Sequence, residues 1–382
     1  MKIKDICTSV TDGSHNPPLG IEKSEYMMLS SKNIFDDEIT FDEPRFLTER
    51  DFEKEHRRTK IAVGDVLFTI VGTVGRIAVV DEDMSTFALQ RSVAVLHPKN
   101  DVCLPRFLMY ALRGKRTYIE NRAKGVAQKG IYLKEVSDID IHIPDISNQE
   151  IIINKLDKVN AIIKLRQKEL LVLDNFIKAR FVEMFGDMVT NYNGWKSVFL
   201  GEACDVRDGT HDSPQYYLEG YPLVTSKNIT GGKIDFTDCS LICAEDYNKI
   251  NQRSKVDYGD ILMPMIGTVG KPVIVDMDEK FAIKNVALIK FRDNSVVINS
   301  FVKALLESDY FDRAVISKIR GGTQKFISLG DIRKLEIYLP PISMQEQFAD
   351  FVKQVNKSKF AVQKTLDQTQ TLFDSLMQKY FG

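Results

Sequence analysis

The sequence predicts an α+β fold in which two β-rich units form an internal repeat and each is followed by a long helix. Three observations support this. The stretch "GDVLFTIVGTVGRIAVV" from Gly64 returns as "GDILMPMIGTVGKPVIV" from Gly259, about 195 positions later. Short apolar runs alternate with Gly, Pro, Asn and Asp in the first part of each copy. The last part of each copy has neither Pro nor internal Gly, and its apolar residues recur every three or four positions.

The repeat runs from one end of the chain to the other. "DGSHNPP" at Asp12 matches "DGTHDSP" at Asp208, and "SSKNI" at Ser30 matches "TSKNI" at Thr225. Near the end of each copy "IHIPDISNQE" matches "IYLPPISMQE". The β-rich parts, residues 1–146 and 187–342, contain strand-like runs such as "DVLFTIV" and "VALIKF" and one short helix each, "RFLMYALRG" and "SFVKALLES".

Residues 147–186 and 343–382 predict two helices about 50–60 Å long at 1.5 Å per residue. Ser147 with Glu150, and Ser343 with Glu346, have the spacing of capping boxes, and Gly186 is expected to end the first helix. The predicted seam consists of Ile152, Leu156, Val159, Ile163, Leu170, Leu173, Ile177, Phe348, Val352, Val355, Val362, Leu366, Phe373 and Leu376. A helix of this length must bury its seam on a partner. An antiparallel coiled coil between the two copies is the simplest arrangement, and an intermolecular coiled coil is the alternative.

Composition narrows the class of protein. The formal net charge of −1 neither favours nor excludes an anionic partner, so any basic surface must come from local segregation of charge. No stretch approaches the ~20 apolar residues that span a bilayer, and the first residues lack a signal-peptide core, so we expect a cytoplasmic protein. The five cysteines favour free thiols in a reducing compartment over a zinc site at Cys239 and Cys243.

Motifs for catalysis are weak. "NPPL" from Asn16 is similar to the Asn-Pro-Pro-aromatic loop of amino-methyltransferases, but Leu19 cannot stack on a flipped base. The second copy has "DSPQ", and no S-adenosylmethionine loop is evident, so a proline-containing turn is favoured. His15 and His211 are the histidines at matching positions, and they suit either a binding loop or the flank of an Asx turn at Asp12 and Asp208.

Two further features concern anion binding. "GTVG" lacks the lysine and spacing of a P-loop and is expected to be a tight strand–turn–strand, followed by Arg76 or Lys271. Between Arg106 and Lys134, eight basic residues interleave with Gly and Tyr against a single acid. The basic glycine loop "RAKGVAQKG" returns as "SKIRGGTQKF" from Ser317. This pattern favours phosphate contact over a merely solvated helix face.

Together the paired "IP.IS.QE" junctions, the "GD[VI]L…GTVG[RK]" stretches and the heptad helices resemble the specificity subunit of type I restriction–modification systems, over the whole chain. The resemblance implies that 1–146 and 187–342 are target recognition domains, each reading one half of an asymmetric bipartite DNA site. It implies that the helices set the spacer and dock two methylation subunits. It also implies a chain without catalytic activity, metal or bound cofactor, with S-adenosylmethionine, ATP and Mg on the methylation and restriction subunits.

Two reading heads on one side of a duplex would have half-site centres about one helical turn, ~34 Å, apart. The DNA-contact candidates are polar residues of the duplicated loops: His15, Lys32, Asn33, Thr73, Arg76, Gln128, Lys129, His211, Lys227, Asn228, Thr268, Lys271, Gln324 and Lys325. Residues shared by both copies suit phosphate or framework roles, so base readers are also expected where the copies diverge, as in 35–46 and 231–239. The alternatives are the specificity part of a related type II system, a non-DNA coiled-coil binding protein, and a methyltransferase using "NPPL".

Overall fold

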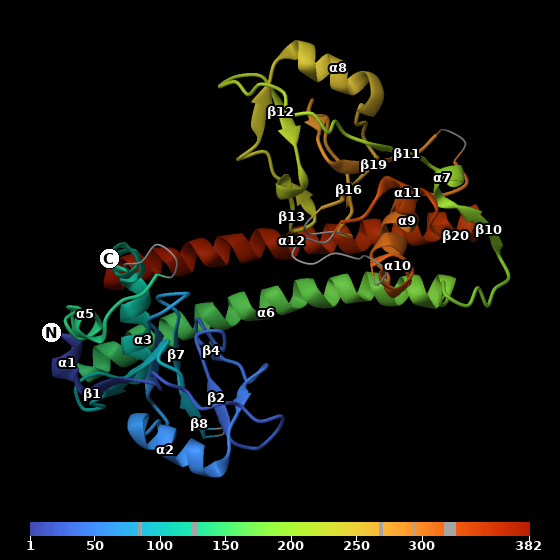
Figure 1. Cartoon of the computed structure of the whole chain (residues 1–382). Helices are drawn as coiled ribbons and strands as arrows, with labels where there is room; N and C mark the ends of the chain where they lie inside the picture. The colour runs from blue at the N-terminus through green and yellow to red at the C-terminus, as the bar shows by residue number, and fades with distance from the viewer. Residues whose placement is uncertain (83, 85, 124–128, 267–269, 293–294, 317–325) are drawn as a thin grey trace. The chain divides into compact units, whose positions relative to one another are not determined.

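The computed structural model describes the chain except for residues 83, 85, 124–128, 267–269, 293–294 and 317–325. The chain divides into two units (Figure 1). Unit 1 comprises Met1–Arg166 and Thr365–Gly382, and unit 2 comprises Gln167–Lys364. Both boundaries fall inside a long helix, so each unit contains one β-rich head and part of both helices.

The head of unit 1 is built on a four-stranded antiparallel sheet in the order β1-β9-β6-β7. A three-stranded sheet, β5-β2-β8, pairs β2 with β8 in parallel, and β3 and β4 form a hairpin. The strands are β1 Cys7–Asp12, β2 Met27–Leu29, β3 Ile34–Phe35, β4 Glu38–Ile39, β5 Arg45–Phe46, β6 Val66–Thr69, β7 Ile77–Val79, β8 Phe87–Leu89 and β9 Val93–Pro98. The helices are α1 Ile3–Ile6, α2 Glu49–Thr59, α3 Pro105–Gly114, α4 Arg116–Arg122, α5 Leu133–Ser137 and the long α6 Ile146–Phe185.

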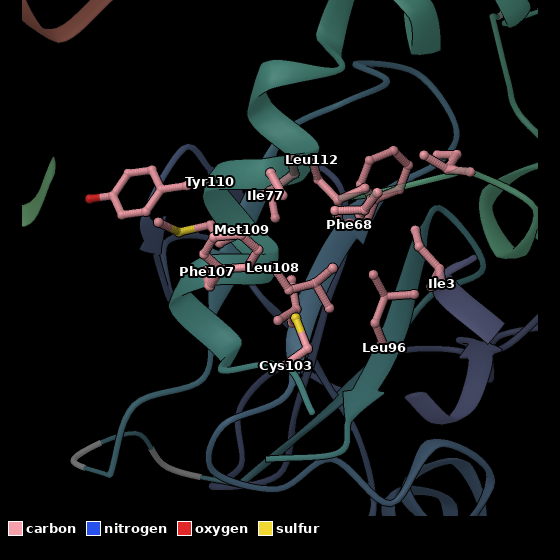
Figure 2. Close-up of a cluster of buried hydrophobic side chains, with 14 of the residues drawn as sticks. Ile3, Phe68, Ile77, Leu96, Cys103, Phe107, Leu108, Met109, Tyr110 and Leu112 are labelled. Carbon is pink, nitrogen blue, oxygen red and sulfur yellow. The ribbon is translucent and has the colours of Figure 1, made fainter. Parts of the chain in front are cut away.

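Both faces of the main sheet are buried. All of β6 and β7 is buried, which explains why their sequences are nearly continuous apolar runs rather than alternating ones. On one face α3 packs Phe107, Leu108 and Leu112 against Phe68 and its neighbours (Figure 2). The other face packs against the three-stranded sheet through a second cluster that contains Leu67. The head is therefore a layered α+β structure.

Unit 2 repeats these three sheets and adds an antiparallel pair, β10 with β20, where the described part of unit 1 has only the isolated bridge between Lys2 and Asp140. Its sheets have the orders β11-β19-β16-β17 and β15-β12-β18, and β13 pairs with β14. The strands are β10 Lys196–Phe199, β11 Asp205–Asp208, β12 Tyr221–Val224, β13 Ile229–Thr230, β14 Lys233–Ile234, β15 Ser240–Ile242, β16 Ile261–Pro264, β17 Val273–Ile274, β18 Ala282–Ile283, β19 Val286–Lys290 and β20 Glu336–Leu339. The helices are α7 Leu200–Ala203, η1 Ser226–Asn228, α8 Ala244–Ser254, α9 Asn299–Leu306, α10 Asp309–Ala314, α11 Leu329–Arg333 and α12 Ile342–Phe381. The predicted duplication of a β-rich head followed by a long helix is confirmed.

The long helices pair in opposite directions within each unit. In unit 1 the first half of α6 and the last turns of α12 contribute Leu156, Ile163, Phe373 and Phe381 to one core. In unit 2 the end of α6 meets the start of α12, with the rings of Phe181 and Phe348 centred 5.6 Å apart. Every residue of the predicted seam is buried or half-buried. The seam also includes Phe181, Phe185 and Phe381, which the heptad pattern did not single out.

The helix starts differ from the prediction. The first long helix spans Ile146–Phe185 and the second Ile342–Phe381, against the expected 147–186 and 343–382. Asp145, not Ser147, caps α6, because its Oδ1 accepts a hydrogen bond from the Asn148 amide at 2.8 Å. Ser147 and Ser343 already lie in the first helical turn, so the predicted capping boxes were wrong.

The glutamine of the repeated "QE" has a structural role at each junction. The Gln149 side chain is fully buried; its Oε1 accepts from the Leu104 amide, and its Nε2 donates to the Val102 and Pro144 carbonyls. Each of these distances is 2.8–2.9 Å. The glutamine therefore satisfies three backbone groups where a head loop meets the long helix.

Candidate nucleic-acid interface

In unit 1 several loops converge at one end of the main sheet, here called the loop end. Strand β1 stops at Asp12 and β6 stops at Thr69, and both lie opposite the beginning of β9. Backbone hydrogen bonds join these loops: the Ser14 amide donates to the Leu89 carbonyl at 2.7 Å, and the Ile70 amide donates to the Ser92 carbonyl at 2.9 Å. Segments far apart in the sequence thus lie together at this end of the sheet.

The "GTVG" stretch of unit 1 is the turn between β6 and β7 at this loop end, which confirms the predicted strand–turn–strand. Gly72 and Gly75 have φ angles of 86° and 92°, which L side chains rarely adopt. The Thr69 hydroxyl fixes the turn by donating to the Thr73 carbonyl and accepting from the Arg76 amide. The glycines therefore shape a turn and form no phosphate cradle of the P-loop type.

A cluster of one carboxylate, one histidine and one arginine lies at the same loop end, where β1 stops. The Asp12 side chain is 9% exposed and accepts from His15 Nε2 at 2.8 Å and from Arg58 Nη2 at 2.9 Å. Arg58 lies near the end of α2 and also donates through Nε to the Asp12 carbonyl. His15 and Arg58 stay 52% and 47% exposed. The buried carboxylate thus holds a histidine and an arginine side chain at the surface.

Unit 2 contains the same cluster. Asp208, 8% exposed, binds His211 Nε2 at 2.9 Å and Arg253 from α8. The His211 ring also reaches Asn285 Oδ1 through Nδ1 at 2.7 Å. The hydrogen bonds to Asn285 and then to Asp208 raise the pKa of His211 above its usual value, because both favour the protonated ring. Asp12 and Asp208 therefore do more than form Asx turns, because each carboxylate contacts a histidine and an arginine.

Glycine precedes the cluster in both copies for a steric reason. A Cβ on Gly13 would lie 2.2 Å from the Leu89 carbonyl oxygen, and a Cβ on Gly209 would lie 2.2 Å from the Ile283 carbonyl oxygen. These contacts are far below van der Waals distance, so only glycine lets the two loops cross here. The "DG[ST]H" repeat therefore encodes a loop crossing and the cation cluster beside it.

The other predicted DNA contacts fall into three groups. Lys32, Thr73, Lys129, Lys227 and Lys271 are exposed. Arg76 is half-buried, with its guanidinium 4.7 Å from the Phe35 ring centroid. Gln128, Thr268, Gln324 and Lys325 lie outside the described residues.

Asn33 and Asn228 require a correction, because both are buried. Asn33 Oδ1 accepts from the Ser30 amide at 3.0 Å, and its Nδ2 donates to the Asp42 carbonyl at 2.8 Å. Asn228 Oδ1 accepts from the Thr225 amide at 3.0 Å. These side chains are committed to shaping their own turns, so we assign them to the framework and remove them from the DNA contacts.

The basic stretch that begins at Arg106 also serves the framework in part. Arg106 forms ion pairs with Asp37 at 3.1 Å and with Asp157 of α6 at 2.7 Å. Arg116 binds Asp36 at 2.6 Å. Although burial opposes the charged form, Asp157 and Asp37 raise the pKa of Arg106. Arg106 therefore attaches the head of unit 1 to α6, whereas Arg116 pairs within the head, and the expected phosphate role does not apply to either side chain.

Sequence reasoning missed Arg58 and Arg253 as site residues. The signal was present, because "RTK" from Arg58 and "RSK" from Arg253 occupy matching positions of the repeat. It was overlooked because helices α2 and α8 were not predicted, and the arginines reach the loop end only from those helices. Arg91, exposed on the loop before β9, was likewise missed.

The comparisons with known proteins agree with this architecture. The family model described as type I restriction modification DNA specificity domain matches residues 1–175 and 192–369. The chain belongs to this family. The two matched segments correspond to the two copies of the repeat, so each head with its helix is one specificity domain.

Three curated relatives are specificity subunits of type I restriction enzymes. The MjaVIII and MjaIX specificity subunits of type I restriction enzymes from Methanocaldococcus jannaschii are each 23% identical to this chain, and the matches cover 70% and 83% of it and 67% and 76% of those proteins. The EcoBI specificity subunit of Escherichia coli is 27% identical, and its match covers 41% of this chain but only 32% of that protein.

Solved structures share the specificity-domain fold. The S subunit of a type I restriction–modification system from M. genitalium superposes with a TM-score of 0.56 at 15% identity, covering 100% of this chain and 95% of that one. A chain from a study of complex assembly and conformational transition of the type I R-M system gives 0.51 at 18% identity, covering 100% and 96%. At these identities the likeness shows the fold alone.

Outside the loop ends, the described residues give little support for a metal site, a catalytic loop or a membrane span. No metal-binding group of three or more His, Cys, Asp or Glu side chains occurs among the described residues. Cys239 and Cys243, weighed above as a zinc pair, are free thiols, and burial raises the pKa of Cys7 and Cys204 to about 12. Leu19 of "NPPL" is 92% exposed. None of the helices in the described parts of the chain is long and apolar enough to cross a membrane.

Proposed function

We propose that this chain is the DNA-recognition subunit of a type I restriction–modification complex, and that each head reads one half of a bipartite target through its loop end. The observation that carries this is the exposed cationic loop end, which recurs in both heads at the same end of the same sheet. Lys and Arg at such a surface supply the phosphate contacts that dominate affinity for DNA.

The two heads share a framework but differ in their exposed loops, which supports an asymmetric target. Arg91 stands where unit 2 has Asn285, and Gln90 stands where it has Lys284. Different half-sites require different side chains at base edges, whereas phosphate contacts can be common to both. The shared cation clusters and the variable loops match this division of roles.

The long helices are proposed to set the spacer and to dock two methylation subunits. Each helix is 40 residues long and pairs through its seam within both units. Exposed apolar side chains on α6, including Ile162 and Val182, remain outside that seam. We propose that the chain acts in the cytoplasm without catalysis of its own. S-adenosylmethionine, ATP and Mg would be bound by the methylation and restriction subunits.

Removing one heptad from either helix tests this function. Seven residues correspond to ~10 Å of helix, or about three base pairs. We expect the variant, assembled with its methylation subunits, to methylate the same two half-sites at a shorter spacing or to lose methylation. Adenine methylation mapped by single-molecule sequencing is the readout. An unchanged spacer would refute the spacer role, and co-purification without any DNA binding would favour a non-DNA coiled-coil protein.

A further inference from the structure

We propose that Arg58 with His15, and Arg253 with His211, each form a clamp for one backbone phosphate of the DNA. This inference rests on the proposed function and names the DNA group that the loop ends bind in common. The clamp is defined by the buried aspartate, the histidine three residues later and the arginine near the end of α2 or α8.

The buried carboxylate orients the cations without covering them. Asp12 uses Oδ2 for His15 and Oδ1 for Arg58, so one edge of each side chain is fixed. The described contacts of Arg58 use Nε and Nη2, which leaves Nη1 for a ligand on the exposed side. A guanidinium held on one edge is pre-organised, so less side-chain entropy is lost when it binds a phosphate.

Charge around the clamps favours an anion. In unit 1 the single carboxylate Asp12 is balanced by Arg58, while Lys32 and Arg91 lie exposed on adjoining loops. In unit 2 the charge of Asp208 is balanced by Arg253. Lys284 follows Ile283, whose carbonyl lies against Gly209. The two acceptors of His211, Asn285 and Asp208, favour its protonated form. Each clamp thus has further basic side chains beside it, in a chain whose formal net charge is −1.

The comparison of the two copies indicates that the ligand of the clamp is a phosphate and not a base. The aspartate, histidine and arginine are the same in both heads, while neighbouring loop positions differ. A side chain common to two heads that read different half-sites carries no sequence information, which is the property of a phosphate contact. The clamp therefore fixes the register of each head on the duplex, and variable side chains beside it read the bases.

The experiment measures DNA binding by the full chain assembled with its methylation subunits, as a function of salt. The probes are a duplex carrying the methylated motif and a duplex with both half-sites scrambled. We expect Arg58→Gln to lower the slope of log K against log salt by about 0.9, and the double variant with Arg253→Gln to lower it by about twice that. Affinity should fall equally for both duplexes, and the methylated motif should not change.

Matched controls remove the same charge outside the clamp. Arg57→Gln lies next to Arg58 on α2, and Lys249→Gln lies on α8; both side chains are exposed. These controls should keep the wild-type slope. A folded Arg58→Gln variant that keeps the wild-type slope, or one that changes the methylated motif, would overturn the proposal. A lower thermal stability with an unchanged slope would show that the pair only ties α2 to the sheet.

A second variant tests the clamp of unit 2 if Arg58→Gln does not fold. His211→Gln keeps a side-chain donor for Asp208 but cannot carry charge, and it should lower the slope at pH 6. An unchanged slope in this variant would also overturn the clamp. If the wild-type complex binds no DNA at all, the proposed function fails; if it binds and the clamp variants keep its slope, only this inference fails.

Discussion

Replacing Gln345 by Met should strongly destabilise unit 2. The Gln345 side chain is fully buried at the start of α12. Its Oε1 accepts from the Ile298 amide at 2.9 Å, and its Nε2 donates to the Val296 carbonyl at 3.1 Å and the Pro340 carbonyl at 3.0 Å. Methionine has nearly the same length but cannot replace these hydrogen bonds, so three backbone groups lose their partner in a fully buried site.

The magnitude follows from these three groups. A backbone group left unsatisfied in the interior costs about 1–3 kcal/mol. Taking the low end, because relaxation and water entry recover part of the loss, gives about 3–5 kcal/mol for the variant. With a urea dependence of about 2 kcal/mol per molar, the unfolding midpoint should fall by roughly 1.5–2.5 M. A loss of that size is a large fraction of the stability of a typical domain.

Trp195 makes the measurement specific to unit 2. It is the one tryptophan of the sequence, and its ring centroid lies 6.2 Å from that of Phe185 in the core of this unit. Urea unfolding followed by tryptophan fluorescence would therefore report on the unit that contains Gln345. The control is Gln347→Met, two positions along the same helix on an exposed side chain. If both variants shifted the midpoint equally, the buried hydrogen bonds would not stabilise the junction as argued.

Two further predictions concern the loop end of unit 2. Gly209→Ala should destabilise the unit by about 2–3 kcal/mol, because its Cβ would lie 2.2 Å from the Ile283 carbonyl oxygen. The control Gly330→Ala should be tolerated, because its Cβ would meet nothing closer than 3.5 Å. Equal urea midpoints for the two variants would contradict this. Since the pKa of His211 is raised in the folded state, its stabilising contribution is complete below the ordinary value of 6.5 and is lost as pH rises through the raised value. The thermal midpoint of unit 2, followed by Trp195 fluorescence, should therefore fall between about pH 6 and 8 more in the wild type than in His211→Gln; parallel curves would contradict this.

Much of the fold was predictable because it depends on patterns that a sequence states directly. The apolar run of "DVLFTIV" predicts a buried strand, and its return in "DILMPMI" predicts a second sheet of the same topology. Apolar residues spaced by three and four placed Leu156 and Phe373 in the helix seam, where both are buried. Repeats and periodicity are local properties, so no knowledge of distant contacts was needed.

The residues that were misassigned depend on contacts between distant segments. Asn33 is polar and recurs in both copies, which is typical of a ligand contact. Its side-chain amide, however, donates to the Asp42 carbonyl, nine residues away. Arg106 has the appearance of a phosphate contact, yet Asp157 binds it from another element. The repeated "RTK" and "RSK" mark Arg58 in the sequence, but its role follows only from the contact that α2 gives it with Asp12. In each case the role is set by which polar group lies opposite in space.

The same reasoning bears on where the target sequence is encoded. The divergent segment 35–46 was expected to hold base readers, but its Asp37 is 9% exposed and binds Lys164 of α6 at 2.9 Å and Arg106 at 3.1 Å. Unit 2 has Gly231 and Gly232 at this hairpin, with no carboxylate to offer. The difference between the copies at this place therefore reflects how each head is attached to its helix. Divergence alone does not identify a base reader; the position must also be exposed at the loop end, as Arg91 is.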